Sequence, residues 1–159
     1  DMIPITLANT HPFVFNPWAF IHNGTVFQAE TLPRDPKLVF SSNNSDTEHL
    51  FHYLLTKIIA KTEDKAISSI IVDSIFSFKL DYTALNMMLS NGRKLYAARC
   101  FQNYEEYYTL YYYALSTGMI ICSEPIESEN LQIDRWVLMA NKSLLRIQCD
   151  PFRYEVILN

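Results

Sequence analysis

The stretch Trp18–Gly24 reads Trp-Ala-Phe-Ile-His-Asn-Gly and ends in two groups that could do chemistry. The side-chain amide of Asn23 beside the backbone N–H of Gly24 brings two hydrogen-bond donors into one small space. Two converging donors are what a developing oxyanion needs. Asn and Gly also tolerate the left-handed backbone of a sharp turn, so an ordinary hairpin turn explains the same pair. Both interpretations stay open for these two residues taken alone.

Two polar stretches flank this one and contain further candidates. Upstream, His11 stands in Asn-Thr-His-Pro-Phe, where Pro12 favours an extended His11. Downstream, Asn-Asn-Ser-Asp-Thr-Glu opens an apolar helix, and Ser45 and Glu48 have the spacing of a capping box. Asp46 falls in the first helical turn, where the helix dipole favours an anion. A satisfied histidine in a turn and a helix start would therefore account for His11 and Asp46 without any ligand.

In order and spacing, these three stretches resemble the glutamine-hydrolysing domain of class II (N-terminal-nucleophile, Ntn) glutamine amidotransferases. The likeness is greatest to the stand-alone bacterial and fungal type, which includes a branch that degrades γ-glutamyl dipeptides. It is sharp over about the first third of the chain. The resemblance implies that Asn23 and Gly24 form an oxyanion hole, that Asp46 binds the α-ammonium of the substrate, and that His11 helps to shape the pocket.

The resemblance also implies a reaction and its substrate. The γ-amide of L-glutamine, or the γ-glutamyl bond of a related compound, is hydrolysed through a thioester on an N-terminal cysteine, and no cofactor is expected. The family places an arginine that grips the glutamine carboxylate shortly before the Asn-Thr-His-Pro stretch. Here no cysteine precedes Cys100 and no arginine precedes Arg34, and the chain begins at Asp1.

These departures from the family pattern lead to two hypotheses. The first is an N-terminally incomplete amidotransferase domain, spanning residues 1–159, that lacks its nucleophile and has no glutaminase activity as it stands. The second is a non-catalytic binding or regulatory module of the same fold. The presence of Asn23, Gly24 and Asp46 together favours the first hypothesis. Arg34 could attract a substrate carboxylate, but an arginine in a loop is more often simply solvated, and we favour that explanation.

Composition restricts the class of partner. The chain has 159 residues, 49% of them apolar, and a net charge of −4. No basic stripe is present, so we expect no nucleic-acid partner. Tyr107–Cys122 is too short and too polar to span a membrane, so no membrane partner is expected either. Without a recognisable signal peptide, we expect a cytoplasmic protein.

Metal-binding patterns are equally sparse. Cys100, Cys122 and Cys149 form no Cys-x-x-Cys pair, and we expect them to be reduced and to bind no zinc. His49 and His52 lie three residues apart in a predicted helix without enough carboxylates for a metal site, so we expect them at its surface or boundary. No metal site is therefore predicted.

Hydrophobic periodicity supplies the elements that must position these residues. It predicts an α+β fold with mainly antiparallel sheets and two helices, near residues 45–61 and 65–78. A strand at Ile70–Val72 is the alternative to the second helix. The resemblance sharpens the fold to a partial αββα (Ntn-hydrolase-like) sandwich. Exposed strand edges would allow a homo-oligomer. The predicted strands are Phe13–Phe15, Trp18–His22, Leu85–Leu89, Lys94–Cys100, Tyr107–Leu115, Gly118–Ser123, Trp136–Met139, Ser143–Ile147 and an edge strand at Tyr154–Leu158, with Trp136–Met139 paired to Ser143–Ile147.

Overall fold

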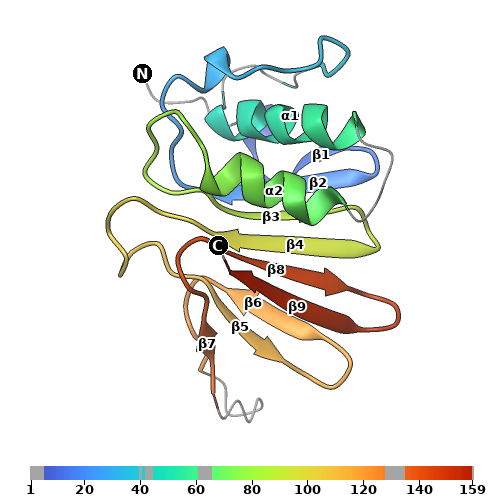
Figure 1. The fold of residues 1–159 in the computed structure, drawn as a ribbon, viewed down its shortest axis with the longest axis vertical. Helices are drawn as coiled ribbons and strands as arrows, with labels where there is room; N and C mark the ends of the chain where they lie inside the picture. The colour runs from blue at the N-terminus through green and yellow to red at the C-terminus, as the bar shows by residue number, and fades with distance from the viewer. Residues whose placement is uncertain (1–5, 40, 42–44, 61–65, 128–134, 159) are drawn as a thin grey trace.

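The computed structural model describes residues 6–39, 41, 45–60, 66–127 and 135–158. Within these ranges, one six-stranded sheet carries most of the architecture (Figure 1). Its order is β1-β2-β3-β4-β8-β9, and every neighbouring pair is antiparallel. The strands are β1 (Phe13–Phe15), β2 (Trp18–Asn23), β3 (Asn86–Ser90), β4 (Lys94–Arg99), β8 (Ser143–Gln148) and β9 (Arg153–Leu158).

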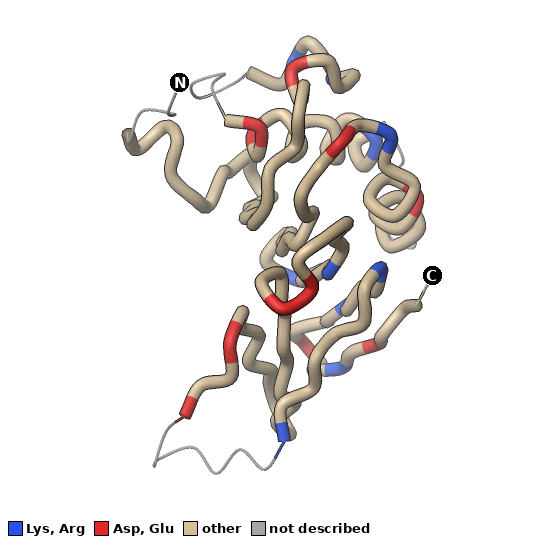
Figure 2. Tube along the Cα trace, turned by 90° about the vertical axis from the view of Figure 1, so that its left-hand side faces the viewer, with Lys and Arg blue, Asp and Glu red and all other residues tan. Residues whose placement is uncertain are grey.

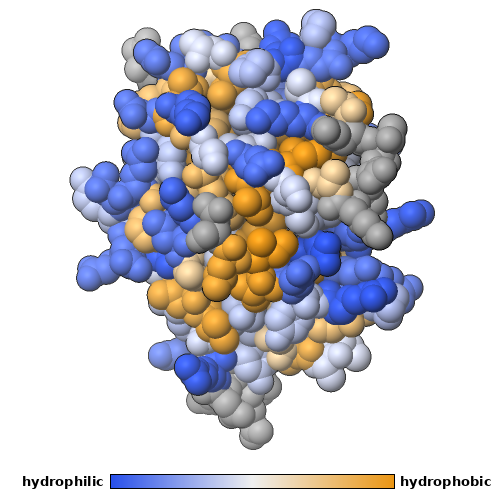
Figure 3. Space-filling model, in the orientation of Figure 1, coloured by the Kyte–Doolittle hydropathy of each residue, from blue (hydrophilic) through white to orange (hydrophobic). Residues whose placement is uncertain are grey.

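Two helices cover one face of this sheet (Figure 1). They are α1 (Asp46–Ile59) and α2 (Ala66–Phe76). The core between helices and sheet is apolar and aromatic, and Phe20 of β2 stacks on Phe51 of α1 with 5.2 Å between ring centroids. Figure 3 shows an apolar patch on the face that carries the helices. Ile70 of α2 and Ile157 of β9 pack against the core and are only partly buried. The two helices therefore leave the β9 edge uncovered.

A second sheet lies on the opposite face of the first. Its strands are β5 (Tyr111–Ala114), β6 (Met119–Cys122) and β7 (Val137–Leu138), in the order β6-β5-β7. A separate apolar cluster joins the two sheets, with Leu145 and Ile147 of β8 against Tyr112 of β5. The layers are thus helices, large sheet and small sheet. Short 3-10 helices at η1 (Leu7–Asn9) and η2 (Ala29–Thr31) complete the described elements.

The predicted fold class is confirmed, namely an α+β fold with antiparallel sheets and two helices. Ile70–Val72 lies within α2 rather than in a strand. The hairpin of β3 and β4 turns at Asn91, whose side-chain oxygen accepts the N–H groups of Arg93 and Lys94. Among the described strands, β9 pairs only with β8, so its predicted place at a sheet edge is also confirmed.

The predicted pairing of Trp136–Met139 with Ser143–Ile147 is wrong. β7 instead pairs with β5, and the N–H of Met139 donates to the carbonyl of Leu110. Both edges of β8 are already occupied, by β4 and β9. The side chain of Asn141 exchanges two hydrogen bonds with the backbone of Phe101, at 3.0 and 3.1 Å. The segment after β7 therefore crosses from one sheet to the other and does not turn back on itself.

Two expectations for α1, one on its capping and one on the exposure of its histidines, are also wrong. The side chain of Ser45 makes no capping hydrogen bond, and the carboxylate of Glu48 accepts the N–H of Ser41 instead. His49 and His52 are buried rather than at the surface. Their helix is covered both by the sheet and by the segment that contains η2, where the N–H of Asp35 donates to the hydroxyl of Thr56.

Charged residues of both signs are interspersed along the trace (Figure 2). Within the described ranges, no helix is long and apolar enough to cross a membrane. The same ranges contain no group of three or more His, Cys, Asp or Glu side chains that could hold a metal ion.

Candidate functional site

The chain leaves the large sheet at Gly24 in a conformation that only glycine adopts readily. Gly24 has φ +143°, and a Cβ there would collide with the backbone of Ala84. The next residue is fixed from both sides, because the N–H of Thr25 donates to the Thr83 hydroxyl and the N–H of Thr83 donates to the Thr25 carbonyl, each at 2.9 Å. The hairpin-turn interpretation of Asn23 and Gly24 is wrong, since β2 pairs with β1 and β3 and with no strand that follows Gly24 directly.

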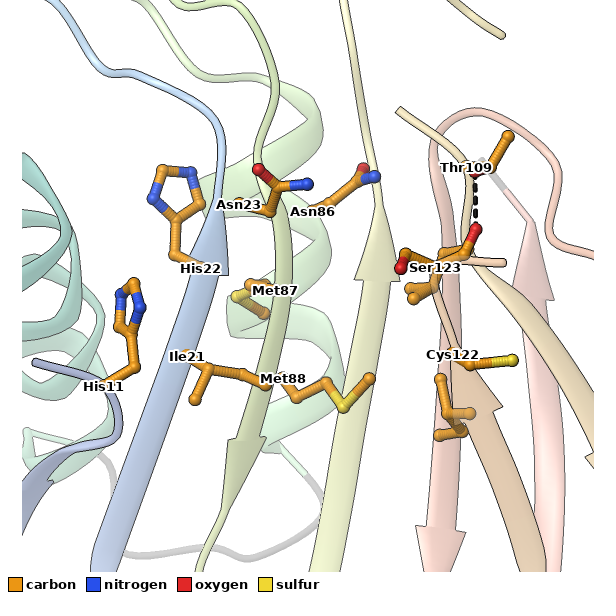
Figure 4. Close-up of a pocket in the computed structure, with 12 residues that line it drawn as sticks. His11, Ile21, His22, Asn23, Asn86, Met87, Met88, Thr109, Cys122 and Ser123 are labelled. Atoms are coloured by element: carbon orange, nitrogen blue, oxygen red, sulfur yellow. Dashed lines mark hydrogen bonds between the residues drawn. The ribbon is translucent and has the colours of Figure 1, made fainter. Parts of the chain in front are cut away.

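A cavity of about 390 Å³ opens beside Asn23, between β2 and β3 on one side and β6 on the other (Figure 4). Asn23 is exposed, and within the described ranges its side chain makes no hydrogen bond. Its carboxamide is therefore available to a ligand. The walls are largely apolar, with His11, Asn86, Thr109 and Ser123 among the polar exceptions. The full lining is His11, Ile21, His22, Asn23, Asn86, Met87, Met88, Thr109, Leu110, Ile121, Cys122 and Ser123.

Asn86 stands directly across the sheet from Asn23, as its register partner. In contrast to Asn23, its carboxamide is fully committed. The oxygen accepts the N–H of Cys100 at 3.0 Å, and the nitrogen donates to the carbonyl of Tyr108 at 3.2 Å. Asn86 thus fixes the wall of the cavity, whereas the carboxamide of Asn23 makes no hydrogen bond within the described ranges.

Asp46 lies beside this cavity rather than in its lining. It is half-buried at the first position of α1, and its Oδ2 accepts the N–H of Val26 at 2.8 Å. The other carboxylate oxygen, Oδ1, has no hydrogen-bond partner in the described part of the chain. The Val26 contact holds the start of α1 against the segment that follows Gly24, so one short piece of backbone separates Asn23 from the attachment point of Asp46.

His11 reaches the cavity from the segment before β1 (Figure 4). Its ring meets the ring of Phe13 edge-on, with 5.4 Å between centroids. Partial burial of the His11 ring lowers its pKa, and the negative charge of Asp46 opposes that shift. Of the four predicted site residues, His11 and Asn23 line the same cavity, while Gly24 and Asp46 are not among its lining residues.

The comparison with known proteins decides the family. The model of the class II glutamine amidotransferases matches residues 4–113. The chain belongs to this family. The match covers the three motifs, both helices and the β3–β4 hairpin, so the amidotransferase domain extends well beyond the first third of the chain, where the motifs lie. No curated protein matches the chain at significant similarity.

Three solved structures share the amidotransferase fold. A glutamine aminotransferase class-II domain protein from Silicibacter pomeroyi superposes with TM-score 0.66 at 23% identity, over 96% of this chain and 73% of its own. A protein from Pseudomonas aeruginosa described as a predicted glutamine amidotransferase gives 0.68 at 17% identity, over 96% and 66%. Glutamine phosphoribosylpyrophosphate amidotransferase from B. subtilis gives 0.61 at 17% identity, over 97% and 33%. The chain thus spans only part of each of these proteins.

None of the three cysteines of this amidotransferase domain offers a reactive thiol to Asn23. Cys100 is buried against the hydroxyl of Tyr82, and burial raises its pKa. Cys122 lines the cavity, but its sulfur points away from Asn23 (Figure 4), and burial raises its pKa as well. Cys149 is exposed just after β8.

Arg34, the other residue considered for substrate binding, donates to the carbonyl of Leu38 within its own loop.

Two residues at the site escape the sequence analysis, His22 and Asn86. His22 shares a face of β2 with the buried apolar residues Trp18 and Phe20, and Asn86 is a buried polar residue in β3 whose same-face neighbour Met88 is apolar and partly buried. A buried polar residue in such a row must find hydrogen-bond partners, and this is the one signal that could have singled them out.

Proposed function

We propose that this domain binds an L-γ-glutamyl group and presents its amide carbonyl to Asn23 and Gly24. The observation that supports this most directly is the 2.8 Å hydrogen bond from Val26 N–H to Asp46 Oδ2. It fastens a carboxylate with one uncommitted oxygen to the segment that begins at Gly24. Two groups that have no hydrogen-bond partner within the described residues, the Oδ1 of Asp46 and the carboxamide of Asn23, are thereby joined through one short stretch of backbone.

In this proposal, the two ends of the substrate meet groups of matching chemistry. The uncommitted Oδ1 of Asp46 accepts a charge-assisted hydrogen bond from the α-ammonium of the substrate. The γ-carbonyl oxygen lies near the carboxamide nitrogen of Asn23 and the N–H of Gly24. Because the two contacts lie at opposite ends of the amino acid, they select for the length of chain between the α-ammonium and the γ-carbonyl.

The reaction proposed for the complete site is hydrolysis of the γ-amide. A cysteine thiolate attacks the amide carbon, and the nitrogen leaves as ammonia, or as an amine from a γ-glutamyl peptide, after taking up a proton. Water then hydrolyses the thioester to glutamate. Negative charge builds on the carbonyl oxygen in both steps, where Asn23 and Gly24 would meet it. Loss of one such donor costs about 2.7–4 kcal/mol of barrier.

The nucleophile in this proposal is the N-terminal cysteine that the family resemblance implies. Its own α-amine would act as the base, since a terminal amine has a pKa of about 7.7–8.0 and accepts a proton near neutral pH. Cys122 is an alternative thiol because it lines the cavity, but its orientation and its raised pKa argue against a role as the nucleophile.

The placement of the three cysteines favours a second candidate function, a non-catalytic module that binds the same amino acid. Such a module would keep the contacts of Asp46 and Asn23 and would release no product. The two functions make the same prediction for ligand binding and differ only in turnover.

The experiment that separates them follows glutamate release from L-glutamine, in parallel for the 159-residue chain and for the protein purified from its native source. We expect no release from the 159-residue chain, and release from the native protein that is lost after thiol alkylation. Glutamate release from the 159-residue chain would contradict the proposed nucleophile. Binding without release in the native protein would establish the non-catalytic module.

A further inference from the structure

We infer that His22 is a positioning residue, whose imidazole, with its hydrogen on Nε2, fixes the Asn23–Gly24 turn relative to the first turn of α1. It thereby sets the separation between the proposed oxyanion donors and Asp46. The consequence for ligand binding rests on the proposed function, whereas the role in holding the turn does not.

The ring of His22 is buried and bonded through both nitrogens. Nε2 lies 3.0 Å from the carbonyl oxygen of Ala84, and Nδ1 lies 3.1 Å from the hydroxyl of Thr47. A carbonyl oxygen can only accept, so Nε2 must carry a hydrogen. Burial lowers the pKa of His22 and favours the neutral ring. In that neutral ring Nδ1 accepts the hydroxyl hydrogen of Thr47.

Both partners of the ring belong to the proposed site. Ala84 is the residue whose backbone fills the space where Gly24 would carry a side chain. Thr47 directly follows Asp46, whose carboxylate accepts the N–H of Val26. A closed circuit results, running from His22 through Thr47 and Asp46 to Val26 and back along the chain to His22.

The circuit joins segments that are far apart in sequence. The bond to Thr47 spans 25 residues and the bond to Ala84 spans 62. The ring also lies parallel to Phe20, at 6.4 Å between centroids with an interplanar angle of 14°, so its plane is fixed from within β2. One side chain therefore connects β2, the start of α1 and the segment that leads into β3, which are the three pieces of backbone around Gly24.

The matched variants are His22→Gln and His22→Leu. A glutamine amide can place a donor where Nε2 stands and so keep the bond to Ala84, whereas leucine fills space and leaves both partners unpaired. Thr47→Val removes only the second bond and keeps the volume. His52→Leu is the control, because His52 is also a buried histidine but lies in α1, outside this circuit.

The first measurement is ligand-independent. Nitrogen NMR of the imidazoles in the full 159-residue chain at pH 7.5 is expected to show His22 neutral with its hydrogen on Nε2. Amide hydrogen exchange at residues 24–26 is expected to accelerate by about tenfold or more in His22→Leu, which loses both bonds. A smaller acceleration is expected in Thr47→Val and in His22→Gln, which each lose only the bond between positions 22 and 47, and none in His52→Leu. A hydrogen on Nδ1 alone, or unchanged exchange in both His22→Leu and Thr47→Val, would overturn the inference. If His22→Leu does not fold, Thr47→Val carries the test.

The second measurement is the affinity for L-glutamine by titration calorimetry. His22→Leu is expected to weaken binding about tenfold, and His22→Gln to restore it to within about threefold of the unsubstituted protein. Equal weakening in His22→Leu and His52→Leu would reduce His22 to a general packing role. If the unsubstituted protein does not bind L-glutamine, the proposed function fails, and the tautomer and exchange results still decide whether His22 holds the turn.

Discussion

The carbonyl group of Ala84 occupies the space in which a side chain on Gly24 would begin. Because Gly24 also has φ +143°, a Gly24→Ala substitution adds backbone strain to a collision with backbone atoms that cannot rotate away. We expect it to lower the free energy of unfolding by about 3 kcal/mol or more, measured by chemical denaturation. Gly118→Ala is the matched control, since nothing lies within 4 Å of its added Cβ. Equal stability of the two variants would contradict the described geometry.

Arg99 ties the two sheets together from a fully buried position. Its guanidinium donates to the carbonyls of Tyr108, Met139 and Glu105 at 2.8, 2.7 and 3.0 Å. Arg99→Met would leave these carbonyls without their donors, and we expect a loss of about 3 kcal/mol in unfolding free energy. Hydrogen exchange should rise first in β5 and β7. The exposed Arg93→Met is the control, and a similarly small effect in both variants would argue against this tie.

Local patterns in the sequence were sufficient to predict β2, α1 and the β3–β4 hairpin. Each is defined by contiguous residues: a short apolar and aromatic run, apolar residues at helical spacing, and a turn with Asn91 and Gly92 between two strands. The pairing of β7 could not be predicted in this way. A hairpin with β8 is the local solution, but the edges of β8 are occupied by β4 and β9, and that competition is decided by the whole sheet.

The same division holds for the site. Asn23 and Gly24 are adjacent, so their two donors could be predicted from the dipeptide. The contact between Asp46 and Val26 spans 20 residues, and that between His22 and Ala84 spans 62. No periodicity encodes such distances. The hydrogen-bond partners of the polar residues that support the site, His22 and Asn86, are therefore identified only by the folded structure.

Stability should depend on pH through the buried histidines. Burial is the main cause that lowers the pKa of His22, His49 and His52. The unfolded chain, with an ordinary histidine pKa of about 6.5, takes up protons that the folded chain resists as the pH falls. Stability is therefore complete above about pH 7 and declines below pH 6.5, by up to about 1.4 kcal/mol per pH unit for each ring.

This pH dependence is checked by denaturation at pH 7.5, 6.5 and 5.5. His52→Gln should reduce the slope, because it removes one of the titrating rings. A free energy of unfolding that is constant or rises on acidification would show that these rings are not held in the neutral form.

Asn23→Ala should separate catalysis from stability. The side chain of Asn23 is exposed and makes no hydrogen bond with the described part of the chain, so unfolding free energy should change by less than about 0.5 kcal/mol. In the native protein, kcat for glutamine hydrolysis should fall by about 10²–10³ with little change in KM. Asn91→Ala is the converse control, since it removes two turn hydrogen bonds far from the cavity. Unchanged kcat in Asn23→Ala would exclude the proposed oxyanion role.

The central claim is that Asp46 receives the α-ammonium of an L-γ-glutamyl ligand, and calorimetric titration of Asp46→Asn with L-glutamine tests it most directly. Asparagine keeps an oxygen for the N–H of Val26 and replaces the other carboxylate oxygen with an NH2 group, so the charge and the second acceptor are both lost. Asp73→Asn on the exposed side of α2 is the matched control. The account predicts that Asp46→Asn weakens L-glutamine binding at least about tenfold and that Asp73→Asn binds normally. Equal affinity of Asp46→Asn and the unsubstituted protein would contradict it.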